Sequence, residues 1–153
     1  MSAPANPRDD LERVRQRIDD IDRELLRLIS ERARCAQEVG HIKSNSGPAA
    51  THGGTLFYRP EREAAILRGI RARNPGPLGD EEVLRVFREI MSACLALERP
   101  LRVAYLGPEG TFTQAAALKH FGHSVESAAL PGIGDIFREV EAGSCDYGVV
   151  PVE

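Results

Sequence analysis

The chain has 153 residues, of which 42% are hydrophobic and 28% charged, a composition typical of a folded globular protein rather than a disordered one. The formal net charge of −3 provides no basic field, so we expect no nucleic-acid partner. No apolar run approaches the roughly 20 residues of a membrane span, and the N-terminus shows no apolar signal segment. We therefore expect no membrane association and a cytoplasmic location, which three widely spaced cysteines also suit.

The chain before Pro100 has the periodicity of helices throughout. Apolar residues recur every three to four positions over residues 11–42, which predicts one long helix starting near the preceding proline. A stretch rich in glycine, proline and small polar residues at 44–55 ends it. Two shorter helices are predicted over 60–73 and 80–99, each bounded by proline or by acidic residues suited to a helix N-terminus.

After Pro100 strand and helix signals alternate. The predicted elements are a strand at 101–106, a helix at 111–121, a weak strand near Val125, a helix at 133–142 and a buried strand at 147–150. This order is typical of an α/β domain with a parallel sheet. The sequence thus predicts an all-α three-helix domain over residues 1–99, followed by the incomplete beginning of an α/β domain over residues 100–153.

The first predicted helix is too long for the unit that contains it. Residues 11–43 would span about 50 Å at 1.5 Å per residue, whereas a three-helix unit of this size is about 25 Å across. The helix must therefore project, and its apolar stripe then needs a partner outside its own unit. A second copy of the same chain is the simplest partner, so we expect a homodimer.

Charged residues interrupt the apolar faces of all three predicted helices. Arg32 occupies a stripe position, Lys43 shares its face because 11 residues complete three turns plus 20°, and Glu63 and Glu98 lie on the inward faces of the other helices. Arg32 could lie at the edge of the stripe and extend to water, or these charges could pair with one another. Together they would also suit a small polyanionic ligand, to which a dimer partner's Arg15 could contribute.

Two sets of motifs carry family resemblances. Residues 11–43, with Ser30-Glu31-Arg32 and Glu38-Val39-Gly40, and the segment Tyr58-Arg59-Pro60-Glu61-Arg62-Glu63 resemble the all-helical chorismate mutases. The stretch 103–112, which contains Gly107-Pro108-Glu109-Gly110-Thr111, and Val149-Val150-Pro151-Val152-Glu153 resemble prephenate dehydratase. In this order the two segments are similar to the bifunctional chorismate mutase–prephenate dehydratases of phenylalanine synthesis.

The resemblance implies a fold, an activity and a set of site residues. The helical part would form an intertwined dimer that converts chorismate to prephenate. Arg32 and the other subunit's Arg15 would hold the two substrate carboxylates, Lys43 and Glu98 would face the ether oxygen of the breaking bond, and Glu63 would hold the ring hydroxyl. The implied set of substrate-binding residues is Arg15, Arg32, Lys43, Arg59, Glu63, Cys94 and Glu98, of which Lys43, Glu98 and Arg32 would be catalytic.

Two of these positions depart from the family pattern: Arg59 stands where some members have an acid, and Cys94 where a small hydroxyl residue is usual. The rearrangement takes place within one molecule, so it needs no nucleophile, and we expect no cofactor and no metal. In the α/β part, the resemblance implies that Glu109, Gly110, Thr111 and Glu153 line a prephenate cleft. As a plain strand-to-helix turn, the same glycine-rich stretch would need no ligand.

One alternative from another functional class remains open at this point. The helical part could be a dimerisation or regulatory module without catalysis, in which the charges on the apolar faces only fix the register of the helices. Binding of chorismate separates the two readings, since a dimerisation module has no reason to bind it.

Overall fold

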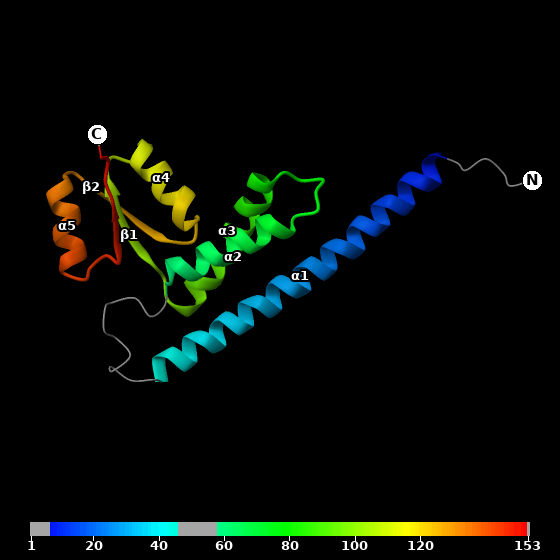
Figure 1. Ribbon diagram of the computed structural model, residues 1–153, viewed down its shortest axis with the longest axis horizontal. Coiled ribbons are helices and arrows are strands. Elements are labelled where there is room, and N and C mark those ends of the chain that lie inside the picture. Colours follow the sequence, from blue (N-terminus) through cyan, green and yellow to red (C-terminus); the bar gives the residue numbers. More distant parts are fainter. Residues whose placement is uncertain (1–6, 46–57, 153) are drawn as a thin grey trace, which may run out of the picture.

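The computed structural model describes residues 7–45 and 58–152. Three helices come first: α1 (Pro7–Asn45), α2 (Pro60–Arg73) and α3 (Asp80–Glu98). They are followed by β1 (Arg102–Leu106), α4 (Phe112–Phe121), β2 (Glu126–Leu130), α5 (Ile133–Glu141) and β3 (Tyr147–Val149). The predicted fold class, a helical unit followed by the start of an α/β unit, is confirmed (Figure 1).

The long helix α1 packs along only part of its length. Its C-terminal half lies against α3, where Ala36 and Gly40 are buried. A Cβ atom at Gly40 would lie 3.2 Å from the Cα of Glu98, so the missing side chain lets the two backbones approach closely. The N-terminal half of α1 projects beyond the other helices, as the length argument predicted (Figure 1).

Helix α3 lies between α1 and α2 and carries most of the buried side chains of the helical part, among them Leu84, Met91 and Cys94. Acidic residues occupy its first turn, where their negative charges interact favourably with the positive end of the helix dipole. Pro60 opens α2, where its missing N–H costs nothing because no helical acceptor exists for it there. These local signals place both helix starts where the sequence predicted them.

The second unit is a three-stranded parallel sheet in the order β2-β1-β3, with helices on both faces (Figure 1). Successive side chains of β1 point to opposite faces: Val103 packs with Ala117 of α4, and Ala104 packs with Ile136 of α5. The predicted strand near Val125 is realised one residue later as the edge strand β2, whose short side chains are mostly exposed. A partly exposed strand has little hydrophobic signal, so its position was the least sharply predicted.

The α/β unit is docked on the helical unit through several specific contacts. Gly122, which follows α4, lies so close to Ser92 of α3 that a Cβ atom there would be 2.4 Å from the Ser92 Cβ. Next to it, the His123 backbone N–H donates to Glu89 at 3.1 Å. On the other side of the junction, Arg99 donates to Asp146 at 2.7 Å. The two units therefore share a defined interface rather than a loose linker.

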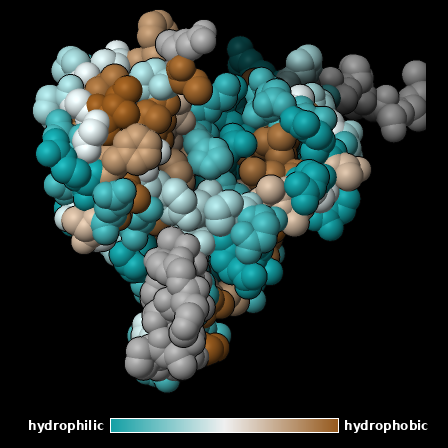
Figure 2. Space-filling view, turned by 60° about the vertical axis from the view of Figure 1, so that its left-hand side comes forward, coloured by the Kyte–Doolittle hydropathy of each residue, from teal (hydrophilic) through white to brown (hydrophobic). Residues whose placement is uncertain are grey.

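Apolar surface remains exposed on the α/β unit. Phe112 and Val152 are almost fully exposed, and Phe137 is more than half exposed. In Figure 2 apolar surface gathers over this unit on the left of the view. No helix in the described residues is long and apolar enough to cross a membrane. Within the same residues, no group of three or more histidine, cysteine or acidic side chains is placed to hold a metal ion.

Candidate active site

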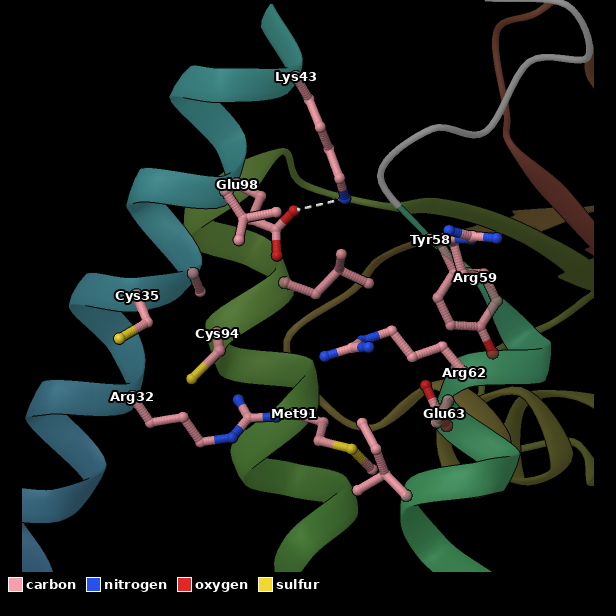
Figure 3. Close-up of a pocket in the computed structure, with 14 residues that line it drawn as sticks. Arg32, Cys35, Lys43, Tyr58, Arg59, Arg62, Glu63, Met91, Cys94 and Glu98 are labelled. Carbon is pink, nitrogen blue, oxygen red and sulfur yellow. Dashed lines mark hydrogen bonds and ion pairs between the residues drawn. The ribbon is translucent and has the colours of Figure 1, made fainter. Parts of the chain in front are cut away.

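A cavity of about 290 Å³ opens where the C-terminal half of α1, the start of α2 and α3 meet (Figure 3). Its floor is partly apolar, with Val39, Ile66 and Met91 among the lining residues. Six charged residues also line it: Arg32, Lys43, Arg59, Arg62, Glu63 and Glu98. Four cations against two acids give the cavity an excess of positive charge, which suits a ligand with more than one negative charge.

Lys43 and Glu98 face each other at one end of the cavity. The Lys43 Nζ donates to Glu98 Oε2 at 3.0 Å, and the two side chains are only 21% and 12% exposed. The close approach of α1 and α3 at Gly40 brings these residues together, because Gly40 lies one turn before Lys43 and directly over Glu98. Both residues lie on faces that the periodicity predicts to point inward, and they form an ion pair in the structure.

Two arginines extend into the cavity from different helices. Arg32 points from α1 toward Met91, and Arg62 points from the first turn of α2 toward the centre of the cavity (Figure 3). A guanidinium group presents a planar fork of N–H donors that matches a carboxylate. Two such groups reaching one cavity from opposite walls can therefore hold a ligand that carries two carboxylates.

The family resemblance implies Arg59 as a site residue, and Arg62 also lines the cavity. Arg59 lies at the rim, where its Nε donates to Glu61 at 3.0 Å and its side chain is mostly exposed. Arg62 is one helical turn before Ile66, another residue of the cavity wall, so the two share a face of α2. That spacing could have identified Arg62 from the sequence as an arginine that α2 contributes to the cavity in addition to Arg59.

Glu63 and Tyr58 form the wall opposite Arg32. Burial raises the pKa of Glu63, while the charge of Arg88 and a hydrogen bond from Tyr58 act against that rise. Burial also raises the pKa of the Tyr58 hydroxyl, and the charge of Glu63 adds to it. The hydroxyl therefore stays protonated and can donate to the carboxylate. Cys94, buried on α3, also lines the cavity, and its side chain points toward α1 (Figure 3).

The remaining candidates do not lie at this cavity. Arg15 is exposed on the projecting half of α1 and is not among the lining residues. Glu109, Gly110 and Thr111 form the turn from β1 into α4, where Thr111 caps the helix by accepting from the Gln114 N–H. Gly110 has a φ of 83°, which other residues rarely adopt. Glu153 lies outside the described residues.

The helical unit matches a known family. Residues 14–99 match the family model of type II chorismate mutases. The chain belongs to the type II chorismate mutase family. Residues 103–153 match the family model of prephenate dehydratases, in the order that the sequence motifs predicted.

Curated relatives carry both segments as well. The chain is 63% identical to a bifunctional chorismate mutase/prephenate dehydratase of Stutzerimonas stutzeri and 60% identical to one of Pseudomonas aeruginosa, in each case over 95% of this chain and 39% of the relative. A relative of the same name from Escherichia coli is 31% identical over 92% of this chain. The chain thus spans about 39% of the length of these relatives.

A solved chorismate mutase (form II) from Thermus thermophilus has the same helical fold. It is 38% identical, superposes with a TM-score of 0.51, and the match covers 58% of this chain and 93% of that protein. The cavity therefore lies in the unit that this family shares, and the α/β unit is additional to it.

Proposed function

We propose that the helical unit, residues 1–99, converts chorismate to prephenate. Residues 100–153 would be the first part of a prephenate dehydratase domain, whose conversion of prephenate to phenylpyruvate needs the longer protein. The observation that carries the proposal is the convergence of Arg32, Arg62 and the Lys43–Glu98 pair on one cavity in a chain of the chorismate mutase family. The exposed apolar side chains of the α/β unit support its assignment as part of a larger domain.

The chemistry requires the residues that the cavity provides. The rearrangement breaks a carbon–oxygen bond and forms a carbon–carbon bond within one dianion, so the protein must hold a compact conformer and stabilise charge on the departing ether oxygen. Arg32 and Arg62 would hold carboxylates, and Glu63 would accept a hydrogen bond from the ring hydroxyl. These groups bind and orient the substrate without reacting with it, and no cofactor takes part.

Lys43 and Glu98 would act on the ether oxygen. The Lys43 ammonium group can donate to an oxygen that gains negative charge in the transition state, where such a contact is strongest in a site that excludes water. Glu98 can donate to the same oxygen only in its protonated form, since an ionised carboxylate has no hydrogen to give. The substrate oxygen would thus take the place that Glu98 Oε2 occupies beside Lys43 in the free protein.

A homodimer would complete the site. The apolar stripe on the projecting half of α1 is exposed in the single chain, which supports its burial against a second copy. In an antiparallel pair, the partner's projecting half would run back across the cavity and could bring its Arg15 to a substrate carboxylate. We place this enzyme in the cytoplasm, where chorismate and prephenate would be its small-molecule partners.

The proposal is tested by measuring the disappearance of chorismate. Loss of an arginine that holds a buried carboxylate costs about 2–5 kcal/mol, so Arg32→Ala and Arg62→Ala should each lower kcat/KM about 30-fold to several thousand-fold. Arg34→Ala and Arg68→Ala are the matched controls on exposed faces of the same helices and should change it less than about twofold.

Two results would contradict the proposal. Unchanged turnover in folded Arg32→Ala and Arg62→Ala proteins would remove the two arginines from the site. A folded, unsubstituted chain that neither consumes chorismate nor binds it in isothermal titration would leave only the reading as a helical dimerisation module.

A further inference from the structure

Tyr58 belongs to both units of the molecule. Its side chain lines the cavity, yet it is only 5% exposed because most of the ring is buried in a cluster with residues of the α/β unit. That cluster contains Leu101, Val103 of β1 and Ala117 of α4. One face of the cavity wall is therefore supported from outside the helical unit.

Two aromatic rings of the α/β unit hold the Tyr58 ring in place. Phe121, the last residue of α4, lies 5.7 Å from it between ring centroids, and Tyr147, the first residue of β3, lies 5.4 Å away at an angle of 87°. Phe121 and Tyr147 also contact each other at 5.3 Å, so the three rings form a closed triangle. Tilted and edge-on contacts of this kind are the geometries that aromatic pairs prefer, and they restrict rotation of the ring.

The hydroxyl end of the Tyr58 ring lies toward the first turn of α2, which carries Glu63 (Figure 3). Glu63 lines the cavity together with Tyr58, its charge helps to raise the pKa of the Tyr58 hydroxyl, and it is the group that would hold the substrate's ring hydroxyl. Since the ring is fixed at one end by Phe121 and Tyr147, the hydroxyl at the other end has a defined position. A chain of contacts thus leads from α4 and β3 through Tyr58 to an acid of the cavity.

The docking of the two units supports this chain of contacts. Gly122 lies close against Ser92 of α3 directly after α4, and Arg99 donates to Asp146 directly before β3. His123 and Glu89 add a further contact between the same surfaces, at 2.7 Å between Nδ1 and Oε1. These contacts hold α4 and the start of β3, which carry the supporting rings, against the helical unit.

We propose that Phe121 and Tyr147 of the α/β unit are positioning residues for the rearrangement, acting through Tyr58 on Glu63. The inference rests on the proposed chorismate mutase function. The mutase site then extends beyond the helical unit, and the α/β unit contributes to mutase catalysis as well as to its own reaction. Neither Phe121 nor Tyr147 touches the substrate.

The test compares chains with leucine at the supporting positions. Phe121→Leu and Tyr147→Leu keep an apolar side chain but remove the ring contacts, and each should raise KM for chorismate about fivefold to tenfold with a smaller change in kcat. Tyr147→Phe keeps the ring and should retain full activity. Phe137→Leu is the matched control, because Phe137 is an exposed aromatic residue of α5 that is not part of the triangle.

Removing the Tyr58 hydroxyl distinguishes an effect on the position of Glu63 from an effect on the stability of the fold. Tyr58→Phe should raise KM by a similar factor while keeping the ring triangle, and adding Tyr147→Leu to it should cause little further loss, since the positioned group is already absent. The inference would be overturned if the increases in KM from Tyr58→Phe and Tyr147→Leu multiplied in the double variant. An unchanged KM in Tyr58→Phe would overturn it as well. A loss of activity that only follows the unfolded fraction in circular dichroism would overturn it too. An unsubstituted chain without mutase activity would instead overturn the proposed function.

Discussion

The two halves of α1 carry the same apolar repeat but meet different surroundings. In the C-terminal half Cys35 and Val39 of the repeat line the cavity, and the small residues Ala36 and Gly40 next to them are buried against α3. In the N-terminal half the corresponding side chains are 47% to 53% exposed: Leu11, Val14, Ile18, Ile21, Leu25 and Leu28. An apolar repeat therefore shows which face of a helix must be covered, but it does not show whether the same chain covers it.

The ion pairs of the two halves of α1 also differ in burial. The N-terminal half has exposed pairs within the helix, such as Arg23 with Asp20 and Arg27 with Glu24. The C-terminal half has the largely buried pair between Lys43 and Glu98, which joins two helices. Exposed pairs three or four residues apart contribute little to stability because water competes for both partners. The buried pair instead fixes two side chains in a cavity, which is a positional role.

The largest effect is expected from a charge in the exposed apolar stripe of the N-terminal half of α1. Ile21→Lys would place an ammonium group in the dimer interface that we propose, so the dimer should dissociate and mutase activity should fall more than about a hundredfold. Analytical ultracentrifugation and the chorismate assay measure the two effects. Asp19→Lys is the control, because it introduces lysine about 200° around the helix from Ile21. It should leave the dimer and the mutase activity nearly unchanged. A dimer that survives Ile21→Lys would contradict the role of the stripe.

In the proposed dimer, each active site contains Arg15 from the N-terminal half of α1 of one subunit and Lys43 from the C-terminal half of α1 of the other. Arg15→Ala and Lys43→Ala should each be inactive alone, because each disables both sites of a dimer. After subunit exchange, half of the dimers are mixed and each contains one intact site, so about a quarter of the unsubstituted activity should return. No recovery after exchange verified by mass spectrometry would show that Arg15 does not act across the interface.

A smaller effect is expected from the close approach of α1 to α3. Gly40→Ala would bring a methyl group to 3.2 Å from the Glu98 Cα, so the helices must separate by a few tenths of an ångström. We expect kcat to fall about tenfold because Lys43 and Glu98 shift. The free energy of unfolding should change by less than about 1 kcal/mol, since alanine is the better helix former. The chorismate assay and urea unfolding measure these two quantities.

Gly69→Ala on α2 is the control for this change. Its new methyl group would meet only the end of the flexible Arg73 side chain at 3.3 Å, so the gain in helix propensity should raise stability with unchanged kcat. Equal kcat values for the two alanine variants would show that the spacing of α1 and α3 does not position the cavity residues.

The smallest effect should come from the exposed pairs of the N-terminal half. Arg27 donates to both Glu24 and Glu31 on the outer face of α1, where its charge is fully hydrated. Arg27→Ala should therefore leave the melting temperature and the dimer unchanged within error, because alanine also favours the helix. A clear drop in melting temperature would mean that the projecting half depends on its outer ion pairs as well as on its stripe.

The helices and most strands could be predicted from the sequence because their signals are local. Proline at the start of α2, acids in the first turn of α3 and the unbroken repeat of α1 act within a few residues of the ends that they define. The charged residues on inward faces were likewise visible from periodicity, and Arg32, Lys43, Glu63 and Glu98 all line the cavity. Their roles in catalysis remain predictions.

Other features depend on contacts between residues far apart in the chain. The presence of Arg62 beside Arg59 at the cavity depends on where the first turn of α2 faces, which follows from the packing of α2 against α3. The triangle of Tyr58, Phe121 and Tyr147 joins three elements whose relative placement no local pattern determines. Such features require the structure, since a sequence without an alignment gives no sign of which distant residues meet.

The pairing of Lys43 with Glu98 has a consequence for selectivity. In the free protein the lysine already has an anionic neighbour at 3.0 Å, so an arriving substrate does not fill an empty place but exchanges one oxygen for another. Under the proposed function, this exchange would be favourable only for a molecule whose carboxylates bind the arginines while its ether oxygen reaches Lys43. A simple dicarboxylic acid would gain the arginine contacts and leave the lysine with its original neighbour. Competition from within the protein thus discriminates against anions that have the right charge but the wrong shape.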